Sequence, residues 1–364
     1  MYFQRIHIEL TNNCNFSCQF CPDSLMTRER GNIDFSMLRK ALDEIAQDKL
    51  TDQILFHLMG EPTLYPQLDK AVGYAKDKGL KVHLTTNGSI MTQELLDRLL
   101  KLDIDHILFS VQTPDEKSFC LRRADIKFIE YKKRVTFLIG KILEENNGTK
   151  TTLSFLTTPL KWLILPSGSF NAISNKKKLI QSINYWIEDI SAHLVGNGMK
   201  EAIENGHRNL YKPLLRSNLL GWNRFAVTGN FFIETRPIGD WVHPALFSKK
   251  IHKARIGCCE GLRQHFSILW NGDLVFCCVD FDGKTSFSNI GKRTIKEAFQ
   301  NREAQAIING FEKLRINHPY CQRCLGDVSL RGALARQIGS IFYFKWYRKY
   351  WLAKRGIEKV ALHA

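Results

Sequence analysis

Apolar and polar positions follow two alternating periods over residues 1–112. Four short apolar runs have the composition of buried strands, and after each one apolar residues recur every three or four positions, as in a helix. The strand-like runs are Ile6–Leu10, Gln53–Met59, Lys81–Thr86 and His106–Gln112. Regular alternation of this kind is typical of a parallel sheet whose strands are joined by crossover helices. We therefore expect an α/β fold.

The helical segments carry start and stop signals. Asp34 precedes the first one and is a suitable N-cap, and Gly79 is placed to end the second. The pattern continues with one long charged helix over about residues 115–145 and with two further strands, Thr151–Leu156 and Phe231–Pro237. Six strand–helix units predict a partial (β/α)6 TIM-like barrel, in which chemistry takes place at the C-terminal ends of the strands.

The stretch between the fifth and sixth strands, about residues 157–230, is longer than a simple crossover. It contains prolines, glycines, a basic run and one apolar periodic segment near residues 179–194, for which we expect one helix. Two interpretations stay open. The stretch is either a variable insertion of the barrel or a cap that covers the substrate.

Length, composition and charge limit the number of domains, the cell compartment and the partners that we expect. The chain has 364 residues, 44% of them hydrophobic, which is enough for one large domain and a smaller one. We find no signal peptide and no apolar stretch long enough to cross a membrane, so we expect a cytoplasmic protein.

Ten cysteines in a protein without an export signal favour metal binding over disulfides. A formal charge of +16 favours an anionic partner, which could be a substrate, an acidic electron donor, nucleic acid or a membrane surface.

Three of the cysteines stand close together directly after the first strand. Cys14, Cys18 and Cys21 form a C-x3-C-x2-C pattern. Three thiolates at this spacing can ligate three irons of a 4Fe–4S cluster and leave the fourth iron open to a small molecule. Structural zinc is a poorer match, because it usually takes four protein ligands.

With the aromatic Phe20 before its last cysteine, the triplet resembles the signature of the radical S-adenosylmethionine (radical SAM) superfamily. Gly60-Glu61-Pro62 ends the second strand and resembles the segment with which that family holds the amino group of SAM, an ammonium that needs carbonyl and carboxylate acceptors. Many members have a further glycine where this chain has Met59. The resemblance implies a 4Fe–4S cluster on the triplet, SAM as cofactor, and contacts to the carboxylate and ribose of SAM from Asn87, Ser110 and Gln112.

The other large group of cysteines lies after residue 250. Cys258-Cys259 and Cys277-Cys278 lie at the two ends of an expected hairpin that turns at Asn271-Gly272, and a C-x2-C pair follows. The arrangement resembles the SPASM and twitch modules of radical SAM enzymes, in the shorter form with one auxiliary 4Fe–4S cluster. The resemblance favours four ligands, Cys259, Cys277, Cys321 and Cys324, while Cys258 and Cys278 stay open as replacements. A structural zinc site on four cysteines is the alternative.

These features divide the chain into three parts. Residues 1–245 form the partial barrel with its insertion, residues 246–330 form a small α+β cluster domain, and residues 331–364 form a tail rich in aromatic and basic residues. The tail is expected either to dock its aromatic face on the barrel, which we favour, or to lie on an anionic membrane surface as a peripheral contact.

Three further candidates follow the fourth strand. Cys120 is either a buried structural cysteine, the interpretation we favour, or a hydrogen-atom donor to the substrate. Arg122 and Arg123 are either a solvated pair or a site for an anionic group of the substrate.

The resemblance implies an enzyme in which SAM is cleaved to a 5′-deoxyadenosyl radical that takes a hydrogen atom from the substrate. An auxiliary cluster favours oxidation of a polar substrate such as a sugar, a cyclitol or another natural-product intermediate, with an acidic reductant such as a flavodoxin or ferredoxin. The alternatives are an epimerase, a peptide-modifying maturase and a non-catalytic metal-binding scaffold. No recognised nucleic-acid motif accompanies the charge, so nucleic acid is not expected as a partner.

Overall fold

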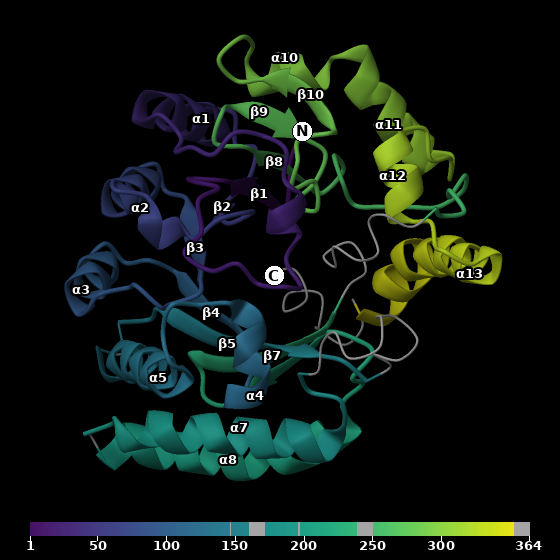
Figure 1. The fold of residues 1–364 in the computed structure, drawn as a ribbon. Coiled ribbons are helices and arrows are strands. Elements are labelled where there is room, and N and C mark those ends of the chain that lie inside the picture. The colour runs from purple at the N-terminus through teal and green to yellow at the C-terminus, as the bar shows by residue number, and fades with distance from the viewer. Residues whose placement is uncertain (146, 160–171, 196, 239–249, 353–364) are drawn as a thin grey trace.

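A computed structural model describes residues 1–145, 147–159, 172–195, 197–238 and 250–352 (Figure 1). Its centre is a ten-stranded sheet with the order β10-β9-β8-β1-β2-β3-β4-β5-β7-β6. Six neighbouring strands run parallel: β1 (Arg5–Ile8), β2 (Gln53–Phe56), β3 (Lys81–Thr86), β4 (His106–Gln112), β5 (Lys150–Thr157) and β7 (Phe231–Pro237). These are the six strands expected from the sequence, and the parallel partial barrel is confirmed.

Helices cover the outer face of these strands (Figure 1). In β1, Ile6 and Ile8 join the hydrophobic core under the helices, while the alternate residues Arg5 and His7 face the inside of the barrel. Asp34 caps the first helix by accepting hydrogen bonds from two backbone N–H groups. The helices that follow the first five parallel strands are α1 (Phe35–Gln47), α2 (Leu68–Asp77), α3 (Gln93–Lys101), α5 (Phe128–Glu145) and α7 (Lys176–Ala192).

The single long helix expected over residues 115–145 is wrong. The chain forms α4 (Glu116–Phe119) and the 3-10 turn η3 (Cys120–Arg122) before α5 begins. Arg123 takes a left-handed conformation with φ of 45°, which ends the helical path. Ala124 then forms a β-bridge with Phe16, a residue of the cysteine-triplet loop. The break therefore brings this segment against the first cysteine set.

The insertion between β5 and β7 contains more than the one helix expected near residues 179–194. Its described part holds α7, a second helix α8 (Asn197–Arg216) and the edge strand β6 (Asn223–Ala226), which pairs antiparallel with β7. α7 packs on α5, and Figure 1 shows α7 and α8 as a layer on the outside of the barrel. These elements favour a barrel insertion over a substrate cap, although residues 160–171 lie outside the described part.

The C-terminal hairpin is an extension of the barrel sheet. β8 (His265–Ile268) and β9 (Asp273–Val275) form the expected antiparallel pair, and β10 (Ser286–Asn289) adds a third strand. β8 also pairs in parallel with β1, which the sequence did not predict. The expected boundary between residues 245 and 246 lies outside the described residues. Short elements complete this region and the loops: η1 (Pro22–Leu25), η2 (Pro62–Leu64), α10 (Ile295–Phe299), α11 (Arg302–Glu312) and α12 (Pro319–Cys324).

The tail is helical as far as it is described. α13 (Leu330–Ile341) continues into the π-helix η5 (Phe342–Leu352). Phe342 and Trp346 are exposed, which does not fit the favoured docking of the aromatic face on the barrel. Among the described residues, no helix is long and apolar enough to span a membrane.

Candidate active site

The cysteine triplet lies on the loop after β1, at the C-terminal edge of the parallel strands. Cys14, Cys18 and Cys21 are partly buried, and none is in a disulfide. The backbone N–H of Phe16 donates to Cys14 Sγ at 3.5 Å. Burial raises the pKa of all three thiols, that of Cys14 to about 12. Without a metal they stay protonated at neutral pH, so metal binding has to displace their protons.

Gly60 brings the Gly60-Glu61-Pro62 segment directly against this loop. Its φ is +78°, and a Cβ at this position would come within 2.5 Å of the Thr11 carbonyl oxygen. The Glu61 N–H donates to the Asn13 carbonyl oxygen at 2.7 Å. Only glycine allows this conformation and this close approach without strain, so the residue fixes the triplet loop to the end of β2.

The Glu61 carboxylate ties the ends of β2 and β3 together. It is 2% exposed and accepts hydrogen bonds from the N–H and hydroxyl of Thr63, from the Thr86 hydroxyl and from the Asn87 N–H. Burial raises its pKa, and the hydrogen bonds oppose that shift. Both oxygens have partners within the chain. What the segment can offer to an amino group is therefore chiefly backbone carbonyl oxygen.

Asn87 extends this network to the cysteine loop. Its side-chain N–H donates to Asn15 Oδ1 at 2.9 Å, and its carbonyl oxygen accepts from the Tyr131 hydroxyl at 2.9 Å. Phe20 lies in a small apolar cluster with Leu156 and Ile238, at the ends of β5 and β7. Both residues are thus at the C-terminal strand ends, and their predicted contacts with SAM stay predictions.

Arg122 is a buried cation beside the triplet. It is 3% exposed, and Nη1 donates to the carbonyl oxygens of Ser110 and Val111 at 2.8 and 2.7 Å. Its guanidinium carbon lies 4.8 Å from the centroid of the Phe16 ring, and Nε is buried without a hydrogen-bond partner. Arg123 is exposed, so the two arginines are not the solvated pair that was one of the two interpretations.

The pKa of Arg122 depends on the charges of the nearby cysteines, and Arg122 in turn affects the pKa of Cys18. Burial disfavours the charged guanidinium, but the cysteines of the triplet and Tyr131 favour it, and the pKa of Arg122 is raised overall. Conversely, Arg122 counteracts part of the effect of burial on the pKa of Cys18. A buried positive charge next to three potential thiolates suits an anionic group bound between them.

The inner face of the barrel below this loop is polar. Burial lowers the pKa of three histidines on this face, that of His57 to about 4 and that of His265 to about 3. The ring centroid of His7, the third of them, lies 6.0 Å from that of His57 and 5.7 Å from that of His265. Arg5 Nε donates to His7 Nε2 at 3.3 Å. The face therefore combines neutral imidazoles with a guanidinium.

A cavity of about 60 Å³ opens in this face. Ser110 and Gln112, two of the predicted SAM contacts, line it, and Gln112 Nε2 donates to Ser110 Oγ at 2.5 Å. Ser154 and Arg236 line it from β5 and β7, and Ser154 Oγ and Arg236 Nε are buried without a partner. Buried polar atoms rarely stay unsatisfied, so the cavity suits a polar ligand.

Cys120 does not line this cavity. It is exposed, and its Sγ donates to the Lys117 carbonyl oxygen at 3.0 Å. It is therefore not the buried structural cysteine that we favoured, and this position gives no support to its role as a hydrogen-atom donor.

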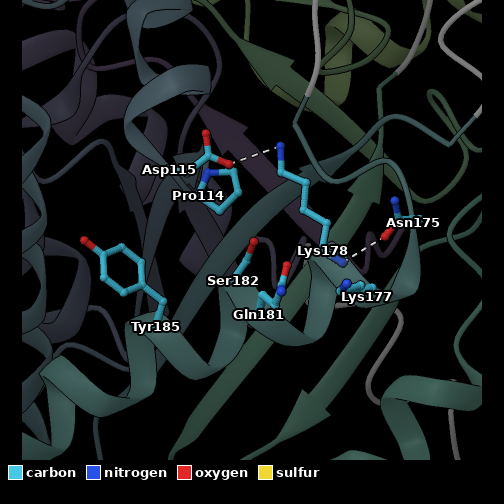
Figure 2. A pocket seen from close by; sticks show the side chains of 8 residues that line it. All are labelled: Pro114, Asp115, Asn175, Lys177, Lys178, Gln181, Ser182 and Tyr185. Carbon is cyan, nitrogen blue, oxygen red and sulfur yellow. Dashed lines mark hydrogen bonds and ion pairs between the residues drawn. The ribbon is translucent and has the colours of Figure 1, made fainter.

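A wider hollow of about 410 Å³ lies between the β4–α4 loop and α7 (Figure 2). Lys178 forms an ion pair with Asp115 at 3.1 Å, and its N–H donates to Asn175 Oδ1. The hollow contains none of the predicted cluster or SAM residues, so its larger volume does not make it the active site.

The second cysteine set comes together from the hairpin and α12. A Cβ on Gly261, two residues after Cys259, would lie 3.5 Å from the Cβ of Cys277. The Tyr320 hydroxyl of α12 donates to the Val279 carbonyl oxygen at 2.9 Å. Burial raises the pKa of Cys277 and of Cys321, and Cys259 and Cys324 add to both shifts, with a further contribution from Cys278 to that of Cys277. The four predicted ligands are therefore neighbours.

The other two cysteines of the doublets lie near the proposed ligands and also have contacts of their own: burial raises the pKa of Cys259, and Cys258 and Cys278 both add to that shift. Cys258 Sγ accepts from Arg263 Nη1 at 3.6 Å, and its N–H donates to Ser340 Oγ of α13. Burial raises the pKa of Cys278, while Arg5 and Arg236 lower it, so Cys278 lies toward the inside of the barrel. The choice of Cys259 and Cys277 as ligands, with Cys258 and Cys278 as replacements, therefore stays a prediction.

The spacing of the thiols bears on the zinc alternative. Within the part of the chain that is described, no three His, Cys, Asp or Glu side chains are close enough together to bind one metal ion. A 4Fe–4S cluster gives each thiolate its own iron and keeps the sulfurs further apart than they are around one zinc ion.

A buried ion pair links the two sets. Glu9, just after β1, pairs with Arg28 at 2.5 Å, and Arg28 Nε donates to the Phe281 carbonyl oxygen. Asp282 accepts from the N–H and hydroxyl of Thr27 at 2.5 and 2.7 Å. Arg28 follows the triplet, and Asp282 follows Cys278 in the chain. Charge-assisted hydrogen bonds thus fix the two cysteine-bearing loops relative to one another.

Two family models match the chain. One, described as the Radical SAM superfamily, matches residues 8–152, and the other, described as an iron-sulfur cluster-binding domain, matches residues 258–325. The first range contains the triplet and the Gly60-Glu61-Pro62 segment, and the second contains the C-terminal cysteine set.

Curated relatives match over part of their length. The chain is 31% identical over 106 residues to a tungsten-containing aldehyde ferredoxin oxidoreductase cofactor-modifying protein of Pyrococcus furiosus, which is 29% of this chain and 30% of that protein. It is 29% identical over 109 residues to the S-adenosyl-L-methionine-dependent 2-deoxy-scyllo-inosamine dehydrogenase of Niallia circulans, 29% of this chain and 44% of that protein. The matches thus span less than two thirds of these relatives.

Solved structures share the fold over most of the chain. Streptococcus suis SuiB bound to the precursor peptide SuiA has a TM-score of 0.55 at 16% identity, with 85% of this chain and 67% of that chain covered. The structure of anSMEcpe with bound AdoMet has a TM-score of 0.52 at 15% identity, with 99% and 97% covered. At these identities the likeness shows the fold alone.

Proposed function

Because the chain belongs to the radical SAM superfamily and carries an iron–sulfur cluster-binding domain, we propose that it is an oxidoreductase acting on a polar substrate inside the barrel. The two families imply 4Fe–4S clusters and SAM as cofactors. One observation carries the proposal. The cysteine triplet is held at the C-terminal strand ends, above a polar cavity, as one unit with a second set of four cysteines.

The proposed roles of the residues follow from their contacts. Cys14, Cys18 and Cys21 hold the first cluster. When bound, this cluster and SAM supply the chemistry that takes a hydrogen atom from an unactivated carbon. Arg122 Nε faces a carboxylate or the cluster charge, because it is a buried cation with an unused donor beside the triplet. Ser110 and Gln112 line the cavity, and we assign to them contacts with SAM and with the substrate.

The cavity indicates a substrate with hydroxyl groups or a negative charge. Ser154 Oγ and Arg236 Nε offer unpaired buried polar groups. His57, with a pKa of about 4, is neutral at pH 7 and serves as a hydrogen-bond partner, not as a base. Oxidation of an alcohol removes a hydrogen atom, a proton, which is released to water, and a second electron. The four cysteines Cys259, Cys277, Cys321 and Cys324 hold the group that accepts this electron.

Charge supports an acidic electron donor. The formal charge of +16 attracts an acidic protein such as a flavodoxin or ferredoxin and raises the rate of encounter.

An epimerase is the second candidate, and the structure changes which thiol it would use. An epimerase has to return a hydrogen atom to the substrate radical from the opposite face. Cys120 is exposed, whereas Cys278 lies near Arg5 and Arg236 on the inside of the barrel. Deuterium from solvent at the reacting carbon of the product would favour the epimerase, and its absence together with a two-electron change would favour oxidation.

The decisive test of the family chemistry is SAM cleavage. Reconstituted, reduced protein is expected to form 5′-deoxyadenosine, and the variant Cys14→Ala/Cys18→Ala/Cys21→Ala to form none. The same variant should keep roughly half of the iron and sulfide, because the second set remains. Equal SAM cleavage by both proteins would remove the assignment.

A further inference from the structure

Helix α13 turns polar and small side chains toward the protein and large apolar side chains toward solvent. A helix that packs on a hydrophobic core has the reverse arrangement. Its inward face carries Ala333, Gln337 and Ser340, which are buried. Gln337 Oε1 accepts from the backbone N–H groups of Arg255 and Ile256 at 2.9 and 3.1 Å. The helix is thus attached to the segment before the Cys258-Cys259 doublet by polar contacts, and burial of large apolar side chains does not hold it there.

The outward face carries the apolar residues instead. Five large side chains recur every four residues and are between 48% and 62% exposed: Leu330, Leu334, Ile338, Phe342 and Trp346. Tyr343 and Tyr347 widen this stripe. It runs from α13 into η5 without a break. Contiguous apolar surface of this kind marks an interaction site, because an exposed helix face is normally polar.

We propose that this apolar stripe lies on an anionic membrane surface. Between Arg331 and Ala364 the chain has eight Lys or Arg and one Glu, a difference of +7. Aromatic side chains with a polar tip, combined with lysine and arginine, are characteristic of helices that lie in the interface of a bilayer. The stripe therefore has both parts of such a helix, the apolar face and the basic charge.

The same charge disfavours a second copy of this chain as the partner. A symmetric contact would place the two stripes face to face and bring the two basic tails together. Each tail has a formal charge of +7, so the contact would be repulsive at ordinary ionic strength. Anionic lipid headgroups neutralise this charge.

The contacts of α13 determine which part of the protein lies near a bound membrane. Gln337 and Ser340 contact residues 255–258, next to the proposed ligand Cys259. A membrane bound to α13 therefore lies on the side of the second cysteine set. This inference is independent of the proposed reaction.

The test is sedimentation of the full reconstituted chain with vesicles of phosphatidylcholine, with and without phosphatidylglycerol. Wild-type protein is expected to bind the mixed vesicles, with binding that weakens as salt is added. The stripe variant Leu334→Gln/Ile338→Gln/Phe342→Gln/Trp346→Gln should bind about tenfold more weakly. The control variant Ile129→Gln/Tyr211→Gln/Leu220→Gln replaces apolar residues that are equally exposed elsewhere, and it should bind like the wild type.

Cluster absorbance and formation of 5′-deoxyadenosine report whether the variants are folded. If the fourfold variant loses its clusters, Phe342→Gln/Trp346→Gln is used instead, with about threefold weaker binding expected. The proposal is overturned by a wild type that stays in the supernatant, by equal binding to uncharged vesicles, or by a stripe variant that binds normally. It is also overturned if the wild type is a dimer in solution and the stripe variant is a monomer. None of these outcomes affects SAM cleavage, so the two proposals fail separately.

Discussion

The first cysteine set lies on one loop, whereas the second is divided between a hairpin and a helix. Cys14, Cys18 and Cys21 follow β1 within eight residues of chain. Beside them lies Arg122, whose Nε has no partner. The second set has four members, and Tyr320 and Gly261 bring its two halves together. One set thus has three thiols and a free buried donor, and the other has four thiols.

This difference separates the tasks of the two sets. A cluster with three protein ligands keeps one iron for a small molecule, and a nearby guanidinium favours an anionic group on that molecule. A cluster with four protein ligands is closed and suits electron transfer. The ion pair of Glu9 and Arg28 and the contacts of Asp282 keep the two sets at a fixed separation. The comparison therefore predicts that the sets can be disabled independently.

The largest effect, the loss of an entire cluster, is expected from removing the closed set. Cys277→Ala/Cys321→Ala should lower the iron content by roughly half and leave the formation of 5′-deoxyadenosine within about threefold of wild type, because the triplet is intact. Iron analysis and chromatography of the reaction mixture measure both. Cys120→Ala is the matched control and should change neither, since this thiol is exposed and its Sγ donates to the Lys117 carbonyl oxygen. Unchanged iron, or zinc in place of iron in the wild type, would contradict the prediction.

The first set was easier to predict than the second for a physical reason. The three cysteines of the triplet are neighbours in the sequence, so their spacing alone constrains the geometry. The choice between Cys258 and Cys259 depends on which side chain faces α12 and which faces Arg263, and adjacent residues in an irregular segment carry no period that decides this. The parallel pairing of β1 with β8 joins segments about 260 residues apart, and no local pattern encodes it.

The burial of Arg122 beside the cysteine triplet could not be predicted from the sequence. The sequence predicted one long charged helix across the break between α4 and α5, and it left the two arginines either as a solvated pair or as a site for an anionic group. The left-handed Arg123 turns the chain and buries Arg122 under the triplet loop. A single basic residue at such a turn gives no sequence signal. The contact with Phe16 becomes visible only in the fold.

A smaller effect is expected from Arg122 itself. Arg122→Met should weaken SAM binding by roughly 10- to 100-fold, the range for loss of one hydrogen bond to a charged group. Arg122→Lys should recover part of this, because it keeps the charge and loses the planar fork. Equilibrium dialysis of reconstituted protein measures the affinity, and iron content reports the cluster. Arg123→Met is the matched control, since Arg123 is exposed. If both methionine variants bind SAM like the wild type, the asymmetry between the two cysteine sets does not come from Arg122.

The smallest effect concerns the pairing of strands β1 and β8, which joins the two cysteine-bearing regions and is called the β1–β8 seam below. His7 on β1 and His265 on β8 lie 5.7 Å apart between ring centroids, and burial lowers the pKa of both, that of His265 to about 3. A lowered pKa in the folded state means that the unfolded state takes up protons first as the pH falls. The stability from a neutral histidine is thus fully present above about pH 6.5 and is lost progressively toward the folded pKa. Each such histidine should lower the free energy of unfolding by about 1 kcal/mol between pH 7.5 and 5.5.

The variant His265→Gln tests this seam, because glutamine keeps a polar side chain that does not titrate in this range. Urea unfolding of the reconstituted protein at pH 7.5 and 5.5 should show a pH-dependent loss of stability that is smaller by about 1 kcal/mol than in the wild type. His252→Gln removes an exposed histidine and should leave the difference unchanged. If His265→Gln shows the full wild-type loss, acid does not act at the β1–β8 seam. The acid-dependent loss of stability would then come from other buried histidines, such as His57, whose pKa burial also lowers.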